Sequence, residues 1–153
     1  NWKLQANLAF NLGGLIGTML TVPVAKHLGR RTMFGIYFVL SSAALFCAFG
    51  LKVPDTVRLW MYFPIGLTVF GVFGSFTYYL PELYPTRLRG TGAGFTYNTG
   101  RLIAAAGPFV VGTIAAGGLA EMQRALFAVG FVPLVGLLVL PLAMETRGRP
   151  LED

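Results

Sequence analysis

Five long runs of residues, four of them uncharged and one interrupted by a single arginine, are the feature that most limits the fold of this sequence. All other charged side chains lie between these runs or at the chain ends, and 55% of the chain is hydrophobic. At 1.5 Å per residue, about 20 helical residues cross a hydrocarbon core of about 30 Å. We therefore predict an all-α, polytopic membrane protein with five transmembrane spans, at about 5–25, 32–51, 59–81, 91–119 and 125–144.

A soluble helical bundle is the alternative to a membrane protein. Surface helices of such a bundle carry a polar face, but only 12% of this chain is charged, about half the fraction usual in soluble domains. The last run has no polar side chain at all from Ala125 to Met144. The sequence therefore favours lipid around these helices.

Lysine and arginine are distributed unequally between the two sides that five spans define. The first and third breaks and the carboxyl-terminal tail hold seven basic residues, whereas the amino end and the other two breaks hold four. Basic loops tend to stay in the cytoplasm, so we predict an external amino end and a cytoplasmic carboxyl end in the plasma (inner) membrane. The net charge of +6 then reflects anchoring in the lipid bilayer, and we expect no nucleic-acid partner.

Arg101 is the one charged residue inside a predicted span. It follows Gly92 by nine residues, which is about 13 Å along a helix and therefore near the middle of the bilayer. A charge there costs at least ~3 kcal/mol unless it pairs or faces water. Its guanidinium can bind a carboxylate or phosphate through two hydrogen bonds, which indicates a small-molecule substrate that is anionic. A structural pair with another helix is the alternative.

Small and polar residues recur at helical spacing in the first, third and fourth spans, and such faces turn away from lipid. Asn98 and Tyr97 precede Arg101 by three and four residues and belong to the predicted substrate cavity. Three further polar residues on these faces complete that cavity: Tyr78, Ser75 and Asn11. Tight helix packing is the preferred explanation for the glycines and threonines on the same faces, including the pair Gly13 and Gly17.

The order of the spans suggests that an amino-terminal segment is missing. The first and fourth spans are rich in Gly, Asn and Thr, and the second and fifth are the most uniformly apolar. If these spans correspond in pairs, the third span needs a counterpart upstream of the first. Two helix triplets in opposite orientations are a common construction of secondary transporters. We therefore expect the missing amino-terminal half of the same protein as a partner of this chain.

Three segments of the sequence carry a resemblance to a known family. They are PELYPTRLRGTGAGFTYNTGRLIAAAGP (81–108), HLGRR (27–31) and ETRGRPLED (145–153). They resemble, in turn, the segment between helices ten and eleven of major facilitator superfamily transporters, the second half of their G-x-x-x-D-R-x-G-R-R signature, and the PETKGR-type ending of their sugar porters. Lys26 stands where the signature has its acid, and Met144 where the ending has its proline. The resemblance implies a carboxyl-terminal fragment that covers helices eight to twelve of a twelve-helix fold.

The resemblance also implies a cytoplasmic latch of charged residues, which is closed when such a transporter opens outward. Glu82 lies at the inner end of the third span, and four arginines emerge on the same side: Arg87, Arg89, Arg30 and Arg31. Exposed ion pairs contribute only about 0–1 kcal/mol each, but a network can bias two states that differ by a few kcal/mol. For Arg30 and Arg31, anchoring of the topology is the alternative role.

These features predict a secondary active transporter that moves a small polar solute by alternating access. The YNTGR segment at 97–101 resembles porters of organic acids and related metabolites more than hexose carriers, so an organic acid is the predicted solute. A sugar porter and a non-transporting membrane scaffold or sensor are the alternatives. We expect no enzyme, since the single histidine has no intramembrane acid or cysteine as a partner. We likewise predict no cofactor and no metal site.

Overall fold

The computed structural model describes residues 1–150, and its regular elements in that range are helices. In chain order they are α1 (Trp2–Leu28), α2 (Arg30–Gly50), α3 (Asp55–Glu82), the 3₁₀ turn η1 (Thr86–Leu88), α4 (Arg89–Ala104), α5 (Ala106–Ala115), α6 (Leu119–Val129), α7 (Val132–Val139) and the 3₁₀ turn η2 (Leu140–Leu142). The prediction of an all-α protein is confirmed.

Within residues 1–150, four helical segments are long and apolar enough to cross a membrane. They are Trp2–Leu28, Arg30–Gly50, Asp55–Glu82 and Leu119–Leu142, the last of which combines α6, α7 and η2. The predicted span at 91–119 corresponds to α4 and α5, which are 16 and 10 residues long and are separated only by Ala105. Where each of the five predicted spans enters and leaves a bilayer stays a prediction.

Prolines explain why the last two predicted spans are interrupted. Pro108 has no amide hydrogen, so the carbonyl of Ala104 loses its usual donor four residues on, and α4 ends there. Pro133 lies at the start of α7 in the same way, just after the break that follows α6. Ser42 of α2 donates a 2.8 Å hydrogen bond to the carbonyl of Gly130 at this second break. A hydroxyl of a neighbouring helix therefore binds a carbonyl where the helical hydrogen bonding is disturbed.

The most extensive helix contact is between α1 and α3. Gly13 and Gly17 of α1 face α3, where an added Cβ would overlap the backbone of Phe63 and Leu67. Gly66 of α3 approaches the backbone of α1 equally closely. Small residues let two backbones come together in a membrane helix pair, and this confirms that the Gly13 and Gly17 pair serves packing.

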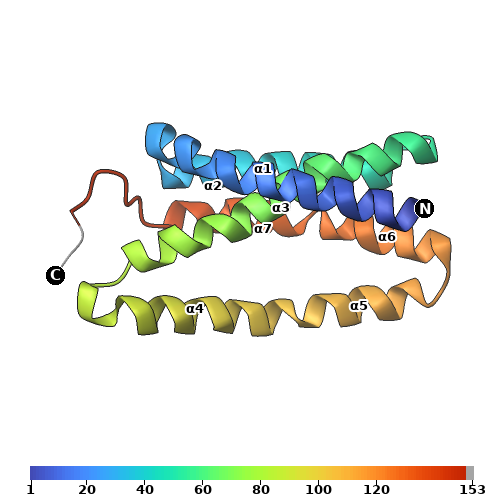
Figure 1. Ribbon diagram of the computed structural model, residues 1–153. Helices are drawn as coiled ribbons and strands as arrows, with labels where there is room; N and C mark the ends of the chain where they lie inside the picture. Colours follow the sequence, from blue (N-terminus) through green and yellow to red (C-terminus); the bar gives the residue numbers. More distant parts are fainter. Residues whose placement is uncertain (151–153) are drawn as a thin grey trace.

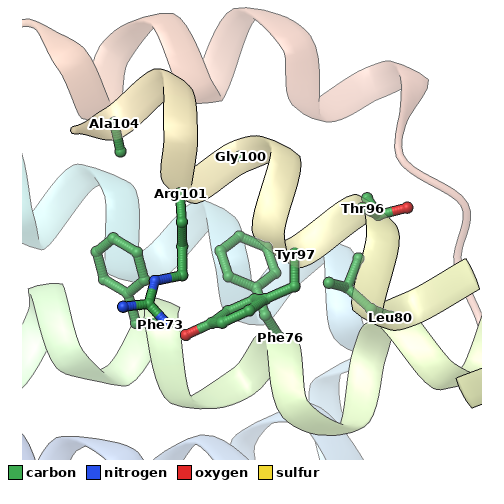
Figure 2. Close-up of a pocket in the computed structure, with 8 residues that line it drawn as sticks. All are labelled: Phe73, Phe76, Leu80, Thr96, Tyr97, Gly100, Arg101 and Ala104. Atoms are coloured by element: carbon green, nitrogen blue, oxygen red, sulfur yellow. The ribbon is translucent and has the colours of Figure 1, made fainter. Parts of the chain in front are cut away.

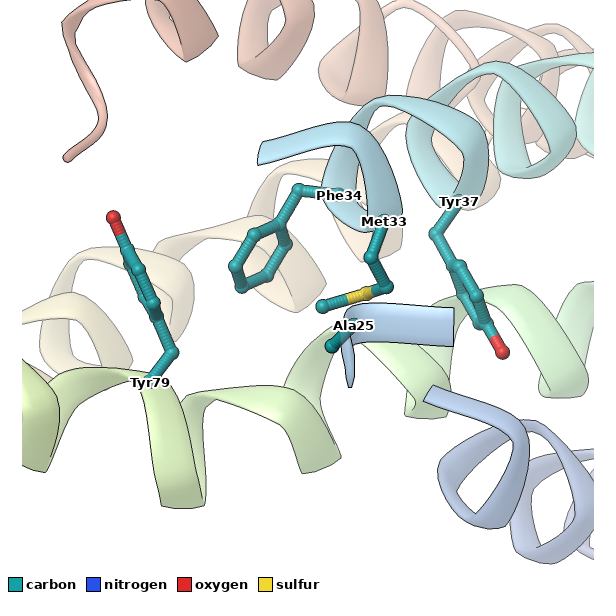
Figure 3. Close-up of a cluster of buried hydrophobic side chains, with 5 residues drawn as sticks. All are labelled: Ala25, Met33, Phe34, Tyr37 and Tyr79. Atoms are coloured by element: carbon teal, nitrogen blue, oxygen red, sulfur yellow. The ribbon is translucent and has the colours of Figure 1, made fainter. Parts of the chain in front are cut away.

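A cluster of buried side chains joins α1, α2 and α3 near the turn between α1 and α2 (Figure 3). It consists of Ala25, Met33, Phe34, Tyr37 and Tyr79. The rings of Phe34 and Tyr79 pack edge to face with their centres 5.2 Å apart. Tyr37 donates a 2.8 Å hydrogen bond to the carbonyl of Gly17. This cluster packs the ends of three helices against one another, at the end that carries Arg30 and Glu82.

The segments that are rich in Lys and Arg lie at one end of the helices (Figure 1). They are the α1–α2 turn, the α3–α4 connection and the carboxyl-terminal tail, whereas the amino terminus lies at the opposite end. Which side of the membrane this end faces stays a prediction. Figure 1 also shows α4 and α5 running end to end as a rod beside the other helices, and no residue of this rod is buried.

Gly17→Ala is expected to destabilise the protein, since the new methyl group would overlap the backbone of Leu67 and push α1 away from α3. Overpacking of this kind typically costs about 1–3 kcal/mol. The measurement is the thermal unfolding midpoint of the purified protein in detergent. Gly90→Ala is the control, because nothing lies within 4 Å of the position that its Cβ would take. Equal midpoints for the two variants would contradict the close contact.

Candidate functional site

A charged cluster, defined by Arg30, Glu82, Glu145 and Thr146, joins the α1–α2 turn, the end of α3 and the tail. Arg30 and Glu82 form a bidentate salt bridge, with Nε to Oε2 at 3.1 Å and Nη2 to Oε1 at 2.7 Å. Both side chains are 20% exposed. Nη1 of Arg30 also donates a 3.2 Å hydrogen bond to the carbonyl of Ala25. This one side chain therefore ties α2 to both α1 and α3.

Glu145 supplies the second carboxylate of the charged cluster. It accepts hydrogen bonds from the backbone amides of Arg30 at 2.9 Å and Arg31 at 3.0 Å, and a third from that of Arg147 at 3.0 Å. The first two amides begin α2, where the helix dipole favours an anion. Gly29 permits this approach, because its φ is 94° and a Cβ there would lie 2.7 Å from a carboxylate oxygen of Glu145. The tail therefore caps the amino end of α2.

The surroundings of Glu145 stabilise its ionised form. Burial alone would raise the pKa of its carboxyl, but the amide hydrogen bonds from Arg30, Arg147 and Arg31 and the charge of Arg30 outweigh burial and lower that pKa. No pattern in the sequence indicates this role. The tail was singled out only as part of a family resemblance, and 115 residues separate Glu145 from Arg30, so that spacing carries no signal of the contact.

Residues on either side of Glu145 fasten the tail to α3. The hydroxyl of Thr146 donates a hydrogen bond to Oε2 of Glu82. The hydroxyl of Tyr79 donates to the carbonyl of Met144 at 2.7 Å. Residues 151–153, the end of the predicted ETRGRPLED motif, lie outside the described residues. Three consecutive tail residues thus contact α2 or α3, which makes the tail part of the charged cluster.

The other three predicted gating arginines lie nearby but do not join that ion pair in residues 1–150. Arg89 donates from Nε to the carbonyl of Pro81 at 3.2 Å, and its Nη2 is buried without a hydrogen-bond partner among those residues. Arg31 and Arg87 have exposed side chains. Arg31 contributes its backbone amide instead. Proximity in the sequence therefore did not identify the partner of the Glu82 carboxylate.

A second feature is the aromatic pocket, a cavity of about 230 Å³ between α3 and α4. Figure 2 shows the side chain of Arg101 reaching from α4 toward α3. Its guanidinium carbon lies 5.8 Å from the centre of the Tyr97 ring, within the range of a cation–π contact. Arg101 and Tyr97 are the predicted cavity residues that line this pocket, together with Phe73, Phe76, Leu80, Thr96, Gly100 and Ala104.

The two predicted asparagines hydrogen-bond within their own helices. Asn98 donates a 2.8 Å hydrogen bond to the carbonyl of Gly94. Asn11 donates to the carbonyl of Asn7 at 2.7 Å and to its side-chain oxygen at 3.1 Å. Both asparagines are exposed, and neither lines the aromatic pocket.

The predicted polar face of the third span packs inside the protein. Thr68 and Ser75 are 2% and 0% exposed, and Ser75 donates a 2.7 Å hydrogen bond to the carbonyl of Val72. Tyr78, on the same face, has a buried hydroxyl without a hydrogen-bond partner among residues 1–150. Neither Ser75 nor Tyr78 lines the aromatic pocket, so this face of α3 contributes to helix packing in the structure.

The two aromatic side chains that α3 brings to the pocket were not predicted from the sequence. Phe73 and Phe76 are apolar residues in an apolar span, so no periodic pattern distinguishes them from lipid-facing residues. Only the structure, which places them opposite α4, shows that they line the pocket. Within the described residues, no group of three or more His, Cys, Asp and Glu side chains could hold a metal ion.

The chain is a polytopic, all-helical integral membrane protein. Its helices are long enough to span a membrane, prolines interrupt two of the predicted spans, and the charged cluster lies at one end of the helices. The chain belongs to the sugar (and other) transporter family of the major facilitator superfamily, whose profile matches residues 4–153. The resemblance seen in the sequence is thereby confirmed for the family, which is one of transporters and not of enzymes. Which half of the transporter fold the chain represents stays a prediction.

Three curated relatives illustrate the range of this family. The chain is 33% identical to the inner membrane metabolite transport protein YhjE of Escherichia coli, with 90% of the chain aligned to 32% of that protein. It is 31% identical to the cis,cis-muconate transport protein of Acinetobacter baylyi, over 78% of the chain and 30% of the relative. It is 32% identical to the low affinity inorganic phosphate transporter 4 of Medicago truncatula, over 97% and 30%. The chain spans about a third of the length of the curated relatives it matches.

Glu145→Gln is expected to lower the free energy of unfolding by about 0.5–2 kcal/mol, because it removes the charge that caps α2. Chemical unfolding of the purified protein in detergent measures this difference. Glu121→Gln is the matched control, since Glu121 pairs with the largely exposed Arg124 on its own helix, at 2.7 Å. Such surface pairs contribute little.

The effect of Glu145→Gln should also depend on pH. The pKa of Glu145 is lowered in the folded protein, so its stabilisation is present at neutral pH and is lost as the pH falls below the ordinary carboxyl value of 4.5. The difference between the wild-type protein and the variant should therefore shrink at acid pH. A difference that grows on acidification would contradict the capping role.

Proposed function

We propose that this chain is the carboxyl-terminal part, helices eight to twelve, of a twelve-helix secondary active transporter that moves a small organic acid by alternating access. Membership of the sugar (and other) transporter family supports transport, and the length of the relatives supports a larger whole. The activity belongs to the complete transporter, to which the missing amino-terminal half contributes.

The single observation that carries the choice of an acid is the position of Arg101 in the aromatic pocket. A guanidinium is unfavourable in an apolar setting unless an anion or water pairs with it. A carboxylate can pair with it through two parallel hydrogen bonds, which fix the orientation of the solute as well as its charge. Two relatives are named for anions, cis,cis-muconate and inorganic phosphate, and this is consistent with an anion site in the family.

The charged cluster is proposed to act as the cytoplasmic latch. Arg30 and Glu82 belong to different helices, and the tail contacts both helices, so separation of the α2 and α3 ends must break several polar contacts together. This arrangement favours the state in which the helix ends are closed. The proposal places the carboxyl terminus in the cytoplasm and the protein in the plasma (inner) membrane, where the related YhjE protein is named as residing.

A sugar is the second candidate solute, because the family description itself names sugars. The hydroxyl groups of a sugar need several hydrogen-bond partners when they leave water. The aromatic pocket offers only three polar side chains in the described chain, those of Thr96, Tyr97 and Arg101. The lining therefore favours an acid over a sugar.

Arg101→Ala is expected to raise the KM for an organic acid at least about tenfold, since hydrogen bonds to a charged group contribute about 1.5–3 kcal/mol. Arg101→Lys keeps the charge but loses the paired geometry, so a smaller rise is expected. Uptake of labelled organic acids and sugars by cells that express the complete transporter measures this. Arg124→Ala, at a side chain that is 76% exposed, is the control. Full uptake by both Arg101 variants would refute the anion contact.

Glu82→Gln is expected to slow or abolish transport while the protein stays folded, because the neutral amide cannot hold the guanidinium of Arg30 in the latch. Initial uptake rates should be compared at matched amounts of protein in the membrane. Glu121→Gln again serves as the control, since its partner lies on the same helix. Unchanged uptake by Glu82→Gln would contradict the latch.

A further inference from the structure

A groove of about 590 Å³, here named the α2–α7 groove, runs between α2 on one side and α7 with η2 on the other. Six of the eight residues that line it are apolar: Gly35, Ile36, Val39, Leu40, Leu137 and Leu140. The side chains of Ile36, Val39 and Leu40 are exposed, so the groove is open along its length. It shares no lining residue with the aromatic pocket.

Arg31 and Thr32 are the two polar residues of the lining, and both lie in the first turn of α2 with exposed side chains. The guanidinium of Arg31 forms no salt bridge among residues 1–150, where the ion pairs are those of Arg30, Arg58 and Arg124. One end of the groove therefore presents a cation that no carboxylate of the described chain neutralises.

The nearby carboxylate of Glu145 does not take this role. It accepts hydrogen bonds from three backbone amides, and it contacts Arg31 through the amide rather than the guanidinium. The loop segments and tail at this end of the helices (Figure 1) carry seven basic residues against four acidic ones. The local charge therefore favours an anion at the Arg31 side chain.

The dimensions of the groove match those of one leaflet of a bilayer. Leu40 follows Arg31 by nine residues, which is roughly 13 Å along a helix and nearly half of a hydrocarbon core of about 30 Å. Because Arg31 lies in the first turn of a helix of membrane-spanning length, it is placed where that core meets the polar headgroups. The apolar walls then extend from the headgroups toward the middle of the bilayer.

The surface around the groove also fits lipid. Leu138 and Val139 of α7 and Leu142 of η2 are more than half exposed and continue the apolar surface beyond the groove. A soluble anion would use only the charged end of such a site. A molecule with a charged head and a long apolar chain uses the whole of it.

We propose that the α2–α7 groove binds an anionic phospholipid. The lipid phosphate pairs with the guanidinium of Arg31 and accepts a hydrogen bond from the hydroxyl of Thr32, and one acyl chain lies along Val39 and Leu140. Arginine suits this contact because its planar fork of donors matches a phosphate, and basic sites between membrane helices are suited to anionic headgroups. The proposal goes beyond the proposed function, since it concerns neither the solute nor the latch.

The test measures where a lipid lies on the purified complete transporter. Nanodiscs of phosphatidylcholine contain a trace of either phosphatidylglycerol or phosphatidylcholine with a photoreactive diazirine in one acyl chain. After irradiation, peptide mass spectrometry gives the share of all labelling that falls on residues 31–40 and 137–142. Phosphatidylglycerol should label these residues roughly fivefold more than phosphatidylcholine. Equal labelling by the two lipids would indicate ordinary boundary lipid and overturn the proposal.

Two charge variants connect this preference to the proposed headgroup contact. Arg31→Gln should bring the labelling ratio of the two lipids close to one. Arg87→Gln is the matched control, because Arg87 is an exposed arginine at the same end of the helices that does not line the groove. An equal loss of preference in both variants would show a general effect of charge and overturn the assignment to Arg31.

Two further variants test the acyl chain. Val39→Trp places a larger side chain in the groove and should reduce its labelling by phosphatidylglycerol severalfold. Leu138→Trp is the matched control, since Leu138 is 80% exposed and does not line the groove. Unchanged labelling in Val39→Trp would refute the acyl-chain site. The measurement needs no solute, so its outcome is independent of the proposed function.

Discussion

The close backbone contact between α1 and α3 is the constraint on which the rest of the structure depends. Glycines let the two helices touch without side chains between them, and the contact extends along much of both helices. As a result, the end of α3 that carries Glu82 lies beside the turn that follows α1. Arg30 begins the next helix at this turn and meets the carboxylate. The charged cluster is thus a consequence of how two apolar helices pack.

The α3 helix serves two neighbours with two different faces. One face, with Thr68, Gly71 and Ser75, is buried and polar or small, and its hydroxyls bond to backbone carbonyls of α3 itself. The other, with Phe73 and Phe76, is aromatic and forms one wall of the pocket with α4. A movement of α3 would therefore act on the charged cluster and on the pocket together, which is the coupling that the proposed alternating access requires.

Local features of the structure could be predicted from the sequence, whereas contacts between residues far apart in the chain could not. The extents of α1, α2 and α3 follow approximately from uncharged runs, and the packing of Gly13 and Gly17 follows from their spacing, because both depend on a few neighbouring residues. The choice of Arg30 as the partner of Glu82 links residues 52 apart and depends on the α1–α3 contact.

The same limit explains what was missed at the two sites. The capping role of Glu145 depends on where the tail returns to α2, across 115 residues. Ser75 was predicted to line the cavity, but a polar residue at helical spacing can equally well face a cavity or pack between helices, and the sequence alone does not distinguish the two. Only its burial in the structure indicates the interface.

Arg101 and the helix break beside it place two groups that are ill-suited to lipid next to the same pocket. Pro108 removes the donor for the carbonyl of Ala104, and Ala104 lines the pocket with the guanidinium. Irregular backbone at membrane depth is tolerated where it lines a water-filled cavity or is buried in protein, and the same holds for a charge. No residue of α4 or α5 is buried within the described chain. The carbonyl of Ala104 and the guanidinium of Arg101 both need polar partners. Both find them if this side of α4 borders the path of an aqueous solute.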